Sequence, residues 1–133
     1  IQARQLAINV PIIVSSLTNL EVQEAGIAAE GAITFAGWLT IEDTPGNRAF
    51  VENYKKTFSE SQTTFSAWAY TALYLLAHAV EQAQSTHPAL IQEQLTKITD
   101  FDTILGKFSF NTDGDAVYSP KILVVKNGMF QPF

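Results

Sequence analysis

The sequence predicts an α/β fold in which short buried strands form a parallel sheet. Two apolar runs, residues 12–14 and 32–36, are typical of strands that are buried on both faces. A helical segment separates them, and such alternation favours parallel neighbours because these require a crossover connection. The composition agrees with a folded chain, since 47% of the 133 residues are hydrophobic and only 16% are charged.

The first part of the chain gives the helix and strand order that this fold needs. Residues 1–7 read as the end of a helix, and Pro11 leads into the first strand. The polar residues 15–19 can cap a helix over 20–29, which Gly31 ends before the second strand begins. Because the chain starts with Ile1 and not with Met, we expect it to be a piece of a longer polypeptide.

Three further helices are predicted in the middle of the chain. A loop over 37–46 precedes a helix that Asn47 caps. A long helix over 67–84 is apolar almost all round, so we expect it to be buried between layers. Pro88 suits the first position of a shorter third helix.

A hairpin is predicted at the carboxyl end. Residues 111–115 contain Asp-Gly and give a strong turn signal, and residues 117–125 read as one strand. A second tight turn follows at Asn127-Gly128. The first turn also has some likeness to a calcium loop, but its twelfth position is Ile122, where an EF-hand needs Glu. The simpler interpretation is a hairpin turn.

Several function classes are excluded or disfavoured by composition. The formal net charge is −5 and Lys and Arg do not cluster, so we expect no nucleic-acid partner. Cysteine is absent, which excludes disulfides and thiolate zinc sites. His78 and His87 lie nine residues apart and lack the spacing of a helical metal pair. No nucleophile, acid/base or phosphate-loop motif is present, so we expect no enzyme, no metal and no cofactor.

The candidate ligand-binding residues are Ser15, Ser16, Thr18 and Trp38. The first three follow a predicted parallel strand, at the sheet edge where ligands of open α/β folds bind. The alternative is that they only cap the next helix. Trp38 follows the second strand and could stack on a ligand or pack in the core. The aromatic residues near the start of the long helix are core by spacing, although some could face a cleft.

The order of motifs resembles one known family. It is similar to the C-terminal portion of a type I periplasmic solute-binding protein, in the branched-chain amino-acid (Leu/Ile/Val) receptor class of ABC transporters. The segments that carry the likeness, in order along the chain, are residues 3–13, 25–31, 47–56, 67–77, 101–115 and 124–130.

The resemblance implies a two-lobed fold with Rossmann-like lobes. Residues 1–36 would end the second lobe, 37–103 would cross over and supply helices to the first lobe, and 104–133 would return to the second. It also implies capture of a small solute, such as an amino acid, by closure of a cleft. The implied location is periplasmic or extracellular, membrane-associated in Gram-positive relatives, and the implied partner is an ABC permease.

Two departures from the family leave alternatives open. Amino-acid receptors commonly carry an acidic residue after the first strand, where this chain has Ser15 or Ser16, and a neutral hydroxyl cannot pair with an ammonium. Another polar or aromatic solute, a sensory domain of the same fold, or a member without binding therefore remain possible. The apolar helix over 67–84 also lacks enough strands to cover it, which predicts either the remainder of the receptor or segment exchange with a second copy.

Overall fold

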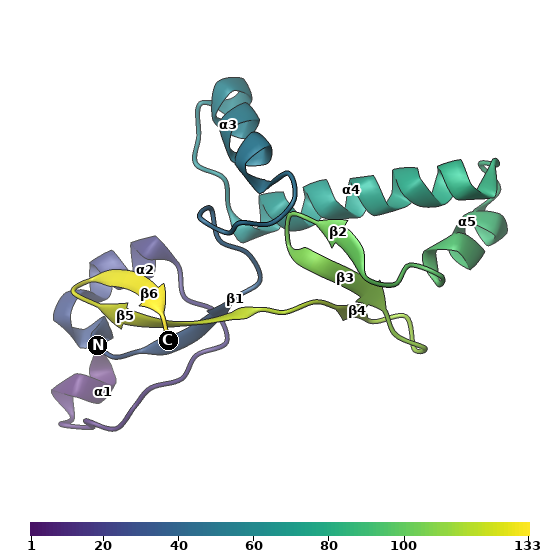
Figure 1. Ribbon diagram of the computed structural model, residues 1–133. Helices are drawn as coiled ribbons and strands as arrows, with labels where there is room; N and C mark the ends of the chain where they lie inside the picture. Colours follow the sequence, from purple (N-terminus) through teal and green to yellow (C-terminus); the bar gives the residue numbers. More distant parts are fainter. The chain divides into compact units, whose positions relative to one another are not determined.

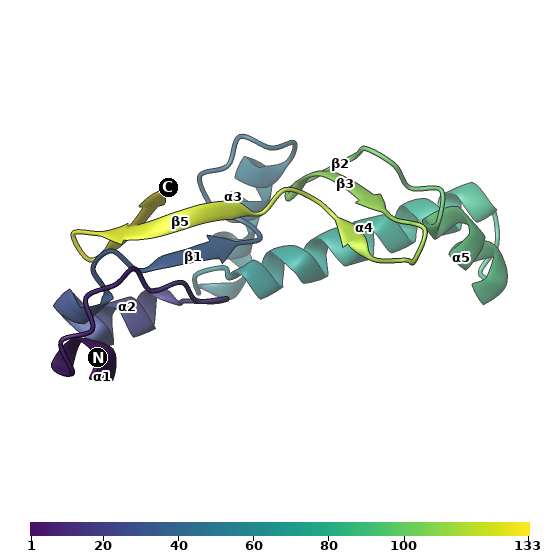
Figure 2. The ribbon, with the colours of Figure 1, turned by 90° about the horizontal axis from the view of Figure 1, so that it is seen from below.

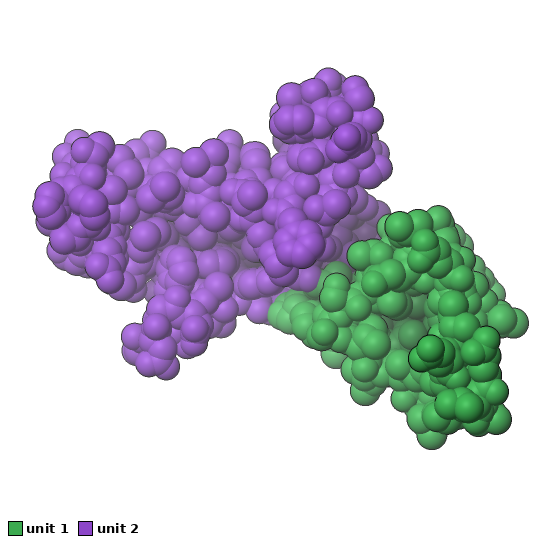
Figure 3. Space-filling view, turned by 180° about the vertical axis from the view of Figure 1, so that it is seen from behind, with its two compact units in different colours: residues 1–36, 120–133 green, residues 37–119 purple.

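The computed structural model describes residues 1–133, which form two compact units. Unit 1 comprises Ile1–Ala36 and Pro120–Phe133, and unit 2 comprises Gly37–Ser119. Figure 3 colours the two units separately. Each unit has its own hydrophobic core, so each is described by itself.

Unit 1 consists of short helices and a three-stranded sheet in the order β1-β5-β6 (Figure 1). Its core joins Val22 and Ala29 to Ala32 and Val125. The elements are α1 (Gln2–Gln5), α2 (Asn19–Ala25), the 3₁₀ helix η1 (Gly26–Ala29), β1 (Ile33–Ala36), β5 (Lys121–Lys126) and β6 (Met129–Pro132).

Parallel pairing in unit 1 is confined to a single bridge, which differs from the predicted parallel sheet. Ile13 pairs in parallel with Ile33, and the Val14 N–H donates to the Ile33 carbonyl at 3.0 Å. The remaining pairs, β1 with β5 and β5 with β6, are antiparallel. The reason is connectivity: only the segment around Ile13 and β1 are joined by a helical crossover, whereas β5 and β6 form a hairpin.

The Asn127-Gly128 turn closes that hairpin as the sequence predicts. Both residues have positive φ, 54° and 71°, as a tight two-residue hairpin turn requires. The Glu30 carboxylate accepts a hydrogen bond from the Asn127 amide at 3.0 Å and another from the Gly128 amide at 3.4 Å. One acidic side chain thus ties the turn to the end of η1.

Unit 2 combines three helices with a second antiparallel sheet in the order β2-β3-β4, and Figure 2 shows that sheet beside α4. Its elements are α3 (Asn47–Phe58), α4 (Thr64–Ala83), α5 (Pro88–Leu95), β2 (Phe101–Thr103), β3 (Gly106–Phe110) and β4 (Ala116–Val117). The core residues are Trp38, Phe50, Ala67, Leu75, Ile98, Ile104, Leu105 and Phe108.

The long helix α4 begins at Thr64, three residues before the predicted start at residue 67, ends close to the predicted residue 84, and is less buried than predicted. Thr63 and Ser66 form a capping box at its start, and Gln84 ends it in the left-handed conformation. One row of the helix is buried, at Ala67, Thr71, Leu75 and Ala79. Its other apolar faces are exposed, because unit 2 supplies no layer that covers them.

Residues 104–119 belong to unit 2, so the segment predicted to return over 104–133 is divided between the units. The cause is local pairing. β3 pairs with β2 on one side and with β4 on the other, and the Tyr118 ring stacks 6.2 Å from Phe108. The predicted strand over 117–125 is accordingly interrupted between β4 and β5, and the return to unit 1 starts at Pro120.

Candidate functional site

Ser15 and Ser16 lie at the carboxyl end of the bridged segment in unit 1. The strand predicted over residues 12–14 is reduced in the structure to a single parallel bridge between Ile13 and Ile33, and α2 and β1 follow it along the chain. Both serines are exposed, and neither hydroxyl is engaged in a hydrogen bond within the chain. Two neutral donor–acceptor groups are therefore available to a solute at this edge.

Thr18 has a different local role, because its side chain caps α2. Its hydroxyl accepts from the Glu21 amide at 3.2 Å and donates to the Glu21 carboxylate at 2.8 Å. The Thr18 amide donates to the same carboxylate at 2.7 Å, which completes a capping box. The Glu21 carboxylate thus accepts two hydrogen bonds from Thr18, and both lower its pKa below the ordinary value of 4.5. The bond from the backbone amide has the larger effect, and the bond from the hydroxyl the smaller. The structure thus realises the capping alternative at Thr18.

Replacing Thr18 tests this cap. Thr18→Ala removes the hydroxyl, so we expect unit 1 to lose about 1 kcal/mol of stability, as N-cap deletions do, and the pKa of Glu21 to rise toward 4.5. Because the folded pKa is lowered, the cap stabilises the fold above pH 4.5 and loses its effect as pH falls through the lowered pKa. A ¹³C NMR titration of the Glu21 carboxyl measures the change, and the exposed Thr86→Ala variant should leave it unmoved. An unchanged titration in Thr18→Ala would contradict the capping role.

Trp38 is buried in unit 2, with 4% of its surface exposed. Its indole N–H donates to the Asn47 side-chain oxygen at 2.7 Å, and the Phe50 ring meets it edge-on at 5.6 Å. The sequence allowed either ligand stacking or packing, and in this structure the indole packs. The sequence predicts that Asn47 caps α3, but Gly46 is the N-cap residue and Asn47 is the first residue of the helix. The Asn47 side-chain nitrogen instead donates to the carbonyls of Leu39, Thr40 and Glu42.

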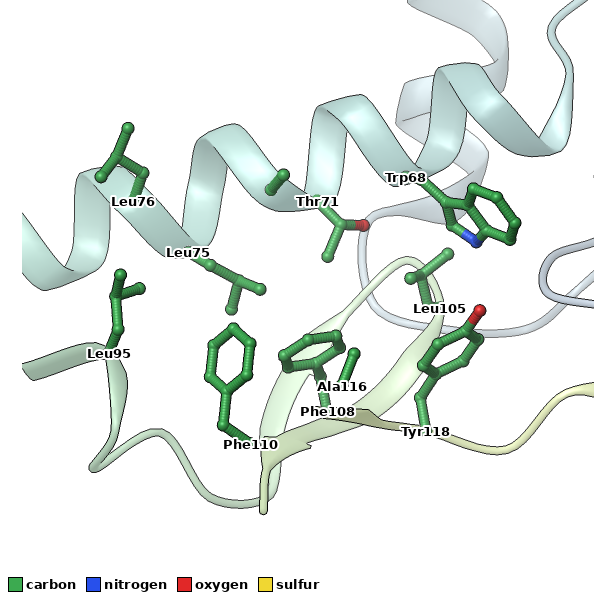
Figure 4. Close-up of a pocket in the computed structure, with 11 residues that line it drawn as sticks. Trp68, Thr71, Leu75, Leu76, Leu95, Leu105, Phe108, Phe110, Ala116 and Tyr118 are labelled. Carbon is green, nitrogen blue, oxygen red and sulfur yellow. The ribbon is translucent and has the colours of Figure 1, made fainter. Parts of the chain in front are cut away.

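Unit 2 also contains an apolar pocket of about 460 Å³ between α4 and the β2-β3-β4 sheet (Figure 4). Sequence reasoning did not find it, because its walls come from segments far apart in the chain. Its walls are formed by Trp68, Thr71, Ala72, Leu75, Leu76, Leu95, Leu105, Phe108, Phe110, Ala116 and Tyr118.

One end of this pocket is polar. Thr71 is 3% exposed, and its hydroxyl has no hydrogen-bond partner. Trp68 and Tyr118 lie at the same end, and Figure 4 shows their polar atoms there. A Cβ added to Gly37 would lie 2.8 Å from the indole nitrogen of Trp68 and 2.9 Å from the Tyr118 oxygen, so glycine permits their close approach to the backbone. We call this pocket the α4 groove.

Titratable side chains do not gather into a reactive centre. No group of three or more His, Asp and Glu side chains is placed to hold a metal ion. The His78 ring packs 4.6 Å from Phe101, and His87 precedes the first turn of α5. The hydrogen bond with Tyr74, together with burial, raises the pKa of Tyr70 to about 12.

No helix is long and apolar enough to span a bilayer.

The Asp-Gly segment in β3–β4 is a hairpin turn. The Asn111 side-chain oxygen accepts from the Asp113 amide at 3.0 Å and from the Asp115 amide at 2.7 Å. The Asn111 side-chain oxygen therefore stabilises the turn, which agrees with the simpler interpretation of this segment as a hairpin turn.

Comparison with known proteins decides the family. The sequence profile of the periplasmic binding protein family matches residues 2–128. The chain belongs to the periplasmic binding protein family. This confirms the predicted resemblance, and the solved structures confirm the type I fold. A comparison with curated protein sequences found no match.

Three solved structures illustrate the similarity of this periplasmic binding protein chain to others. The leucine-binding protein LivK of Thermotoga maritima is 27% identical, with a TM-score of 0.85 over 99% of this chain and 39% of that one. LivJ of Streptococcus pneumoniae, a branched-chain amino acid transporter substrate-binding protein in complex with isoleucine, is 28% identical, with a TM-score of 0.78 over 98% and 38%. An ABC transporter solute-binding protein of R. palustris in complex with benzoate shares the fold at 18% identity, with a TM-score of 0.73 over 98% and 37%.

These structures are solute-binding proteins and not enzymes. The chain spans 37% to 39% of their lengths, so the activity of a whole receptor is a matter of proposal for this chain.

Proposed function

We propose that this chain is part of the extracytoplasmic substrate-binding component of an ABC transporter, located in the periplasm or outside the cell. It would capture a small solute, an amino acid or a related molecule, by cleft closure and deliver it to a permease in the membrane. The observation that supports this most strongly is the family match over residues 2–128, together with the likeness to a leucine-binding protein over 99% of the chain.

Ser15 and Ser16 are the proposed contacts to the solute in unit 1. Their hydroxyls are exposed and unengaged, directly after the segment that Ile13 bridges to β1. Thr18 would act at the same edge by fixing the start of α2, since its hydroxyl is already bonded to Glu21. For Trp38 we propose an indirect part, in which the buried indole holds the loop before α3 through Asn47.

The absence of an acid at positions 15 and 16 shapes the proposed ligand class. A solute ammonium would find only neutral hydroxyls in this segment before Glu21, whose carboxylate already accepts two hydrogen bonds from Thr18. Neutral groups bind polar atoms without charge pairing, so we propose that an amide or hydroxyl of the solute faces this edge. Benzoate in the R. palustris structure illustrates that this fold also holds solutes without an ammonium group.

A thermal-shift screen tests the proposed function. The protein as its gene encodes it is heated with amino acids, their amides and small carboxylates. A ligand at about 100 times its dissociation constant stabilises the native state by about 2.7 kcal/mol, which raises the melting temperature by several degrees. If no compound of the three classes shifts the melting temperature, the solute-capture proposal fails and the alternative of a member without binding is favoured.

Substituting the serines tests the proposed contacts. We expect S15A and S16A each to weaken binding of the best solute by about two- to tenfold, the usual range for one hydrogen bond of about 0.5–1.5 kcal/mol. Calorimetric titration gives the dissociation constants, and the exposed Ser61→Ala serves as the matched control in unit 2. Equal affinities in all variants would remove Ser15 and Ser16 from the proposed site.

A sensory domain of the same fold is the alternative function. It would bind the same solute but signal to a protein partner, so binding data alone do not distinguish it from a transport component. Uptake of the radiolabelled solute by cells that lack the gene distinguishes them: lost uptake supports transport, and unchanged uptake supports sensing.

A further inference from the structure

Gly37 is a glycine for a different reason from the other six glycines of the chain. Those six all have positive φ, between 55° and 95°, a conformation that favours glycine. Gly37 is not among them, so its backbone conformation does not require glycine. What it lacks is room, because an added Cβ would lie 2.8 Å from the Trp68 indole nitrogen and 2.9 Å from the Tyr118 hydroxyl oxygen. The glycine is therefore explained by two side chains that lie against its backbone.

Both of these side chains are anchored by other aromatic rings. Trp68 lies near the start of α4, and its ring meets Phe65 edge-on with the centroids 5.3 Å apart. The Tyr118 ring stacks on Phe108, which is a buried core residue. Trp68 and Tyr118 lie at the polar end of the α4 groove (Figure 4). Since packed interiors transmit a displacement and do not absorb it, neither ring can retreat from Gly37 without losing these contacts.

Gly37 and Tyr118 lie close to the two points where the chain passes between the units. Within residues 1–133 these points follow Ala36 and Ser119. In unit 1, Ala36 pairs with Lys121 in the antiparallel ladder of β1 and β5. In unit 2, the Tyr118 hydroxyl lies against Gly37. The two connecting segments are therefore adjacent where they leave unit 1 and again where they enter unit 2.

We propose that Gly37, Trp68 and Tyr118 form a clamp that holds the two connecting segments together at the edge of unit 2 and limits how freely the units move relative to each other. We call these three residues the Gly37 clamp. The proposal rests on the proposed function, because capture by cleft closure requires such motion. Trp68 and Tyr118 are positioning residues in it, since they act on the connecting segments and not on the solute.

The Gly37 clamp acts on affinity through the population of the binding-competent arrangement. Loosely held connecting segments would allow the two units many relative orientations, and solute binding would have to order them at a cost in free energy. The anchored rings restrict these orientations before the solute arrives. Opening the clamp lowers the binding-competent fraction and raises the apparent dissociation constant by the same factor.

Distances between two spin labels test the Gly37 clamp without any solute. Residues 1–133 contain no cysteine, so Glu24→Cys in α2 and Gln92→Cys in α5 provide one exposed labelling site in each unit. The protein as its gene encodes it carries both labels, and any cysteine outside these residues is replaced by serine. Pulsed electron paramagnetic resonance then gives the distribution of distances between the labels.

G37A should broaden this distribution, because its methyl group has no room and opens the Gly37 clamp. W68L should also broaden it, because leucine ends before the position of the indole nitrogen. In the W68L background G37A should add little, since contacting residues are not independent. Y118F removes the oxygen that lies 2.9 Å from the added Cβ, so G37A/Y118F should give a narrower distribution than G37A alone.

Controls separate the Gly37 clamp from general loss of stability. Gly114→Ala makes the same chemical change in an exposed turn, where an added Cβ meets nothing within 4 Å, and should leave the distance distribution unchanged. Each variant should keep the helical circular dichroism of the wild type. Narrowing of the G37A distribution by Y118F is a signature that a purely destabilising change would not give.

Two results without solute would overturn the proposal: wild-type distributions in both G37A and W68L, or broadening that simply adds in the double variant. With the best solute of the thermal-shift screen, G37A should raise the dissociation constant by about two- to twentyfold. Wild-type affinity in G37A despite a broadened distribution would also overturn it. If the distributions respond as expected but no solute binds to the wild type, the proposed function fails while the Gly37 clamp itself is supported.

Discussion

Asn47→Ala is expected to destabilise unit 2 by about 3 kcal/mol, because one side chain satisfies four buried or half-buried groups. Asn47 is 1% exposed. Its oxygen accepts from the Trp38 indole at 2.7 Å, and its nitrogen donates to the Glu42 carbonyl at 2.8 Å and to the carbonyls of Leu39 and Thr40 at 3.2 and 3.3 Å. Alanine removes all four hydrogen bonds and also opens a cavity. Urea unfolding followed by tryptophan fluorescence measures the loss.

The matched control for this change is Asn53→Ala. Asn53 lies on the same helix α3 but is exposed, so its replacement should change the free energy of unfolding by less than about 0.5 kcal/mol. Similar losses at the two asparagines would show that the hydrogen bonds around Trp38 contribute little, and the account of Asn47 would be wrong.

Phe50→Ala should cost about 3–5 kcal/mol, the usual range for a buried phenylalanine. Phe50 is 5% exposed, and its ring lies 5.6 Å from Trp38 and 4.7 Å from Tyr70. It therefore joins the loop before α3 to α4, and its removal leaves a cavity between the two. The same urea unfolding experiment measures the effect.

Phe58→Ala is the control, since it makes the same chemical change at the end of the same helix. Phe58 is 58% exposed, and its ring centroid lies 4.6 Å from that of Tyr54. We expect its loss to cost less than about 1 kcal/mol. If Phe50→Ala cost no more than Phe58→Ala, the core of unit 2 would not be organised around Phe50.

Local signals in the sequence predicted the local structure well. Pro88 at the start of α5 and the Asn127-Gly128 turn both lie where the sequence places them. Each depends on residues that are near in the chain, so single-sequence reasoning can find them.

Features that depend on distant partners were missed or differ. The pairing of β2 with β3 was not predictable from the sequence, because Phe101–Thr103 is short and its burial comes from packing. The role of Asn47 depends on Trp38 and on loop carbonyls, which no helix-cap pattern encodes. The exposed faces of α4 differ from the prediction because apolar character all round a helix predicts burial only where a covering layer is present.

The sequence predicts part of the surroundings of the candidate site. Ser15 and Ser16 follow a segment that pairs in parallel with β1 as expected, but only through the single bridge of Ile13, because the rest of the predicted strand over 12–14 does not form. At Thr18 the choice between ligand contact and cap depends on the side-chain position of Glu21, which the structure supplies. Their contact with a solute stays a prediction.

Isothermal titration calorimetry tests the central claim, solute capture, most directly. The protein as its gene encodes it is titrated with L-leucine, with L-leucinamide, in which an amide replaces the carboxylate, and with 4-methylpentanoate, which lacks the ammonium group. We expect saturable one-to-one binding of at least one of these compounds. We also expect 4-methylpentanoate to bind no more weakly than leucine, because neutral serines stand at positions 15 and 16. No heat of binding for any of the three, nor for the compounds of the wider screen, would contradict it.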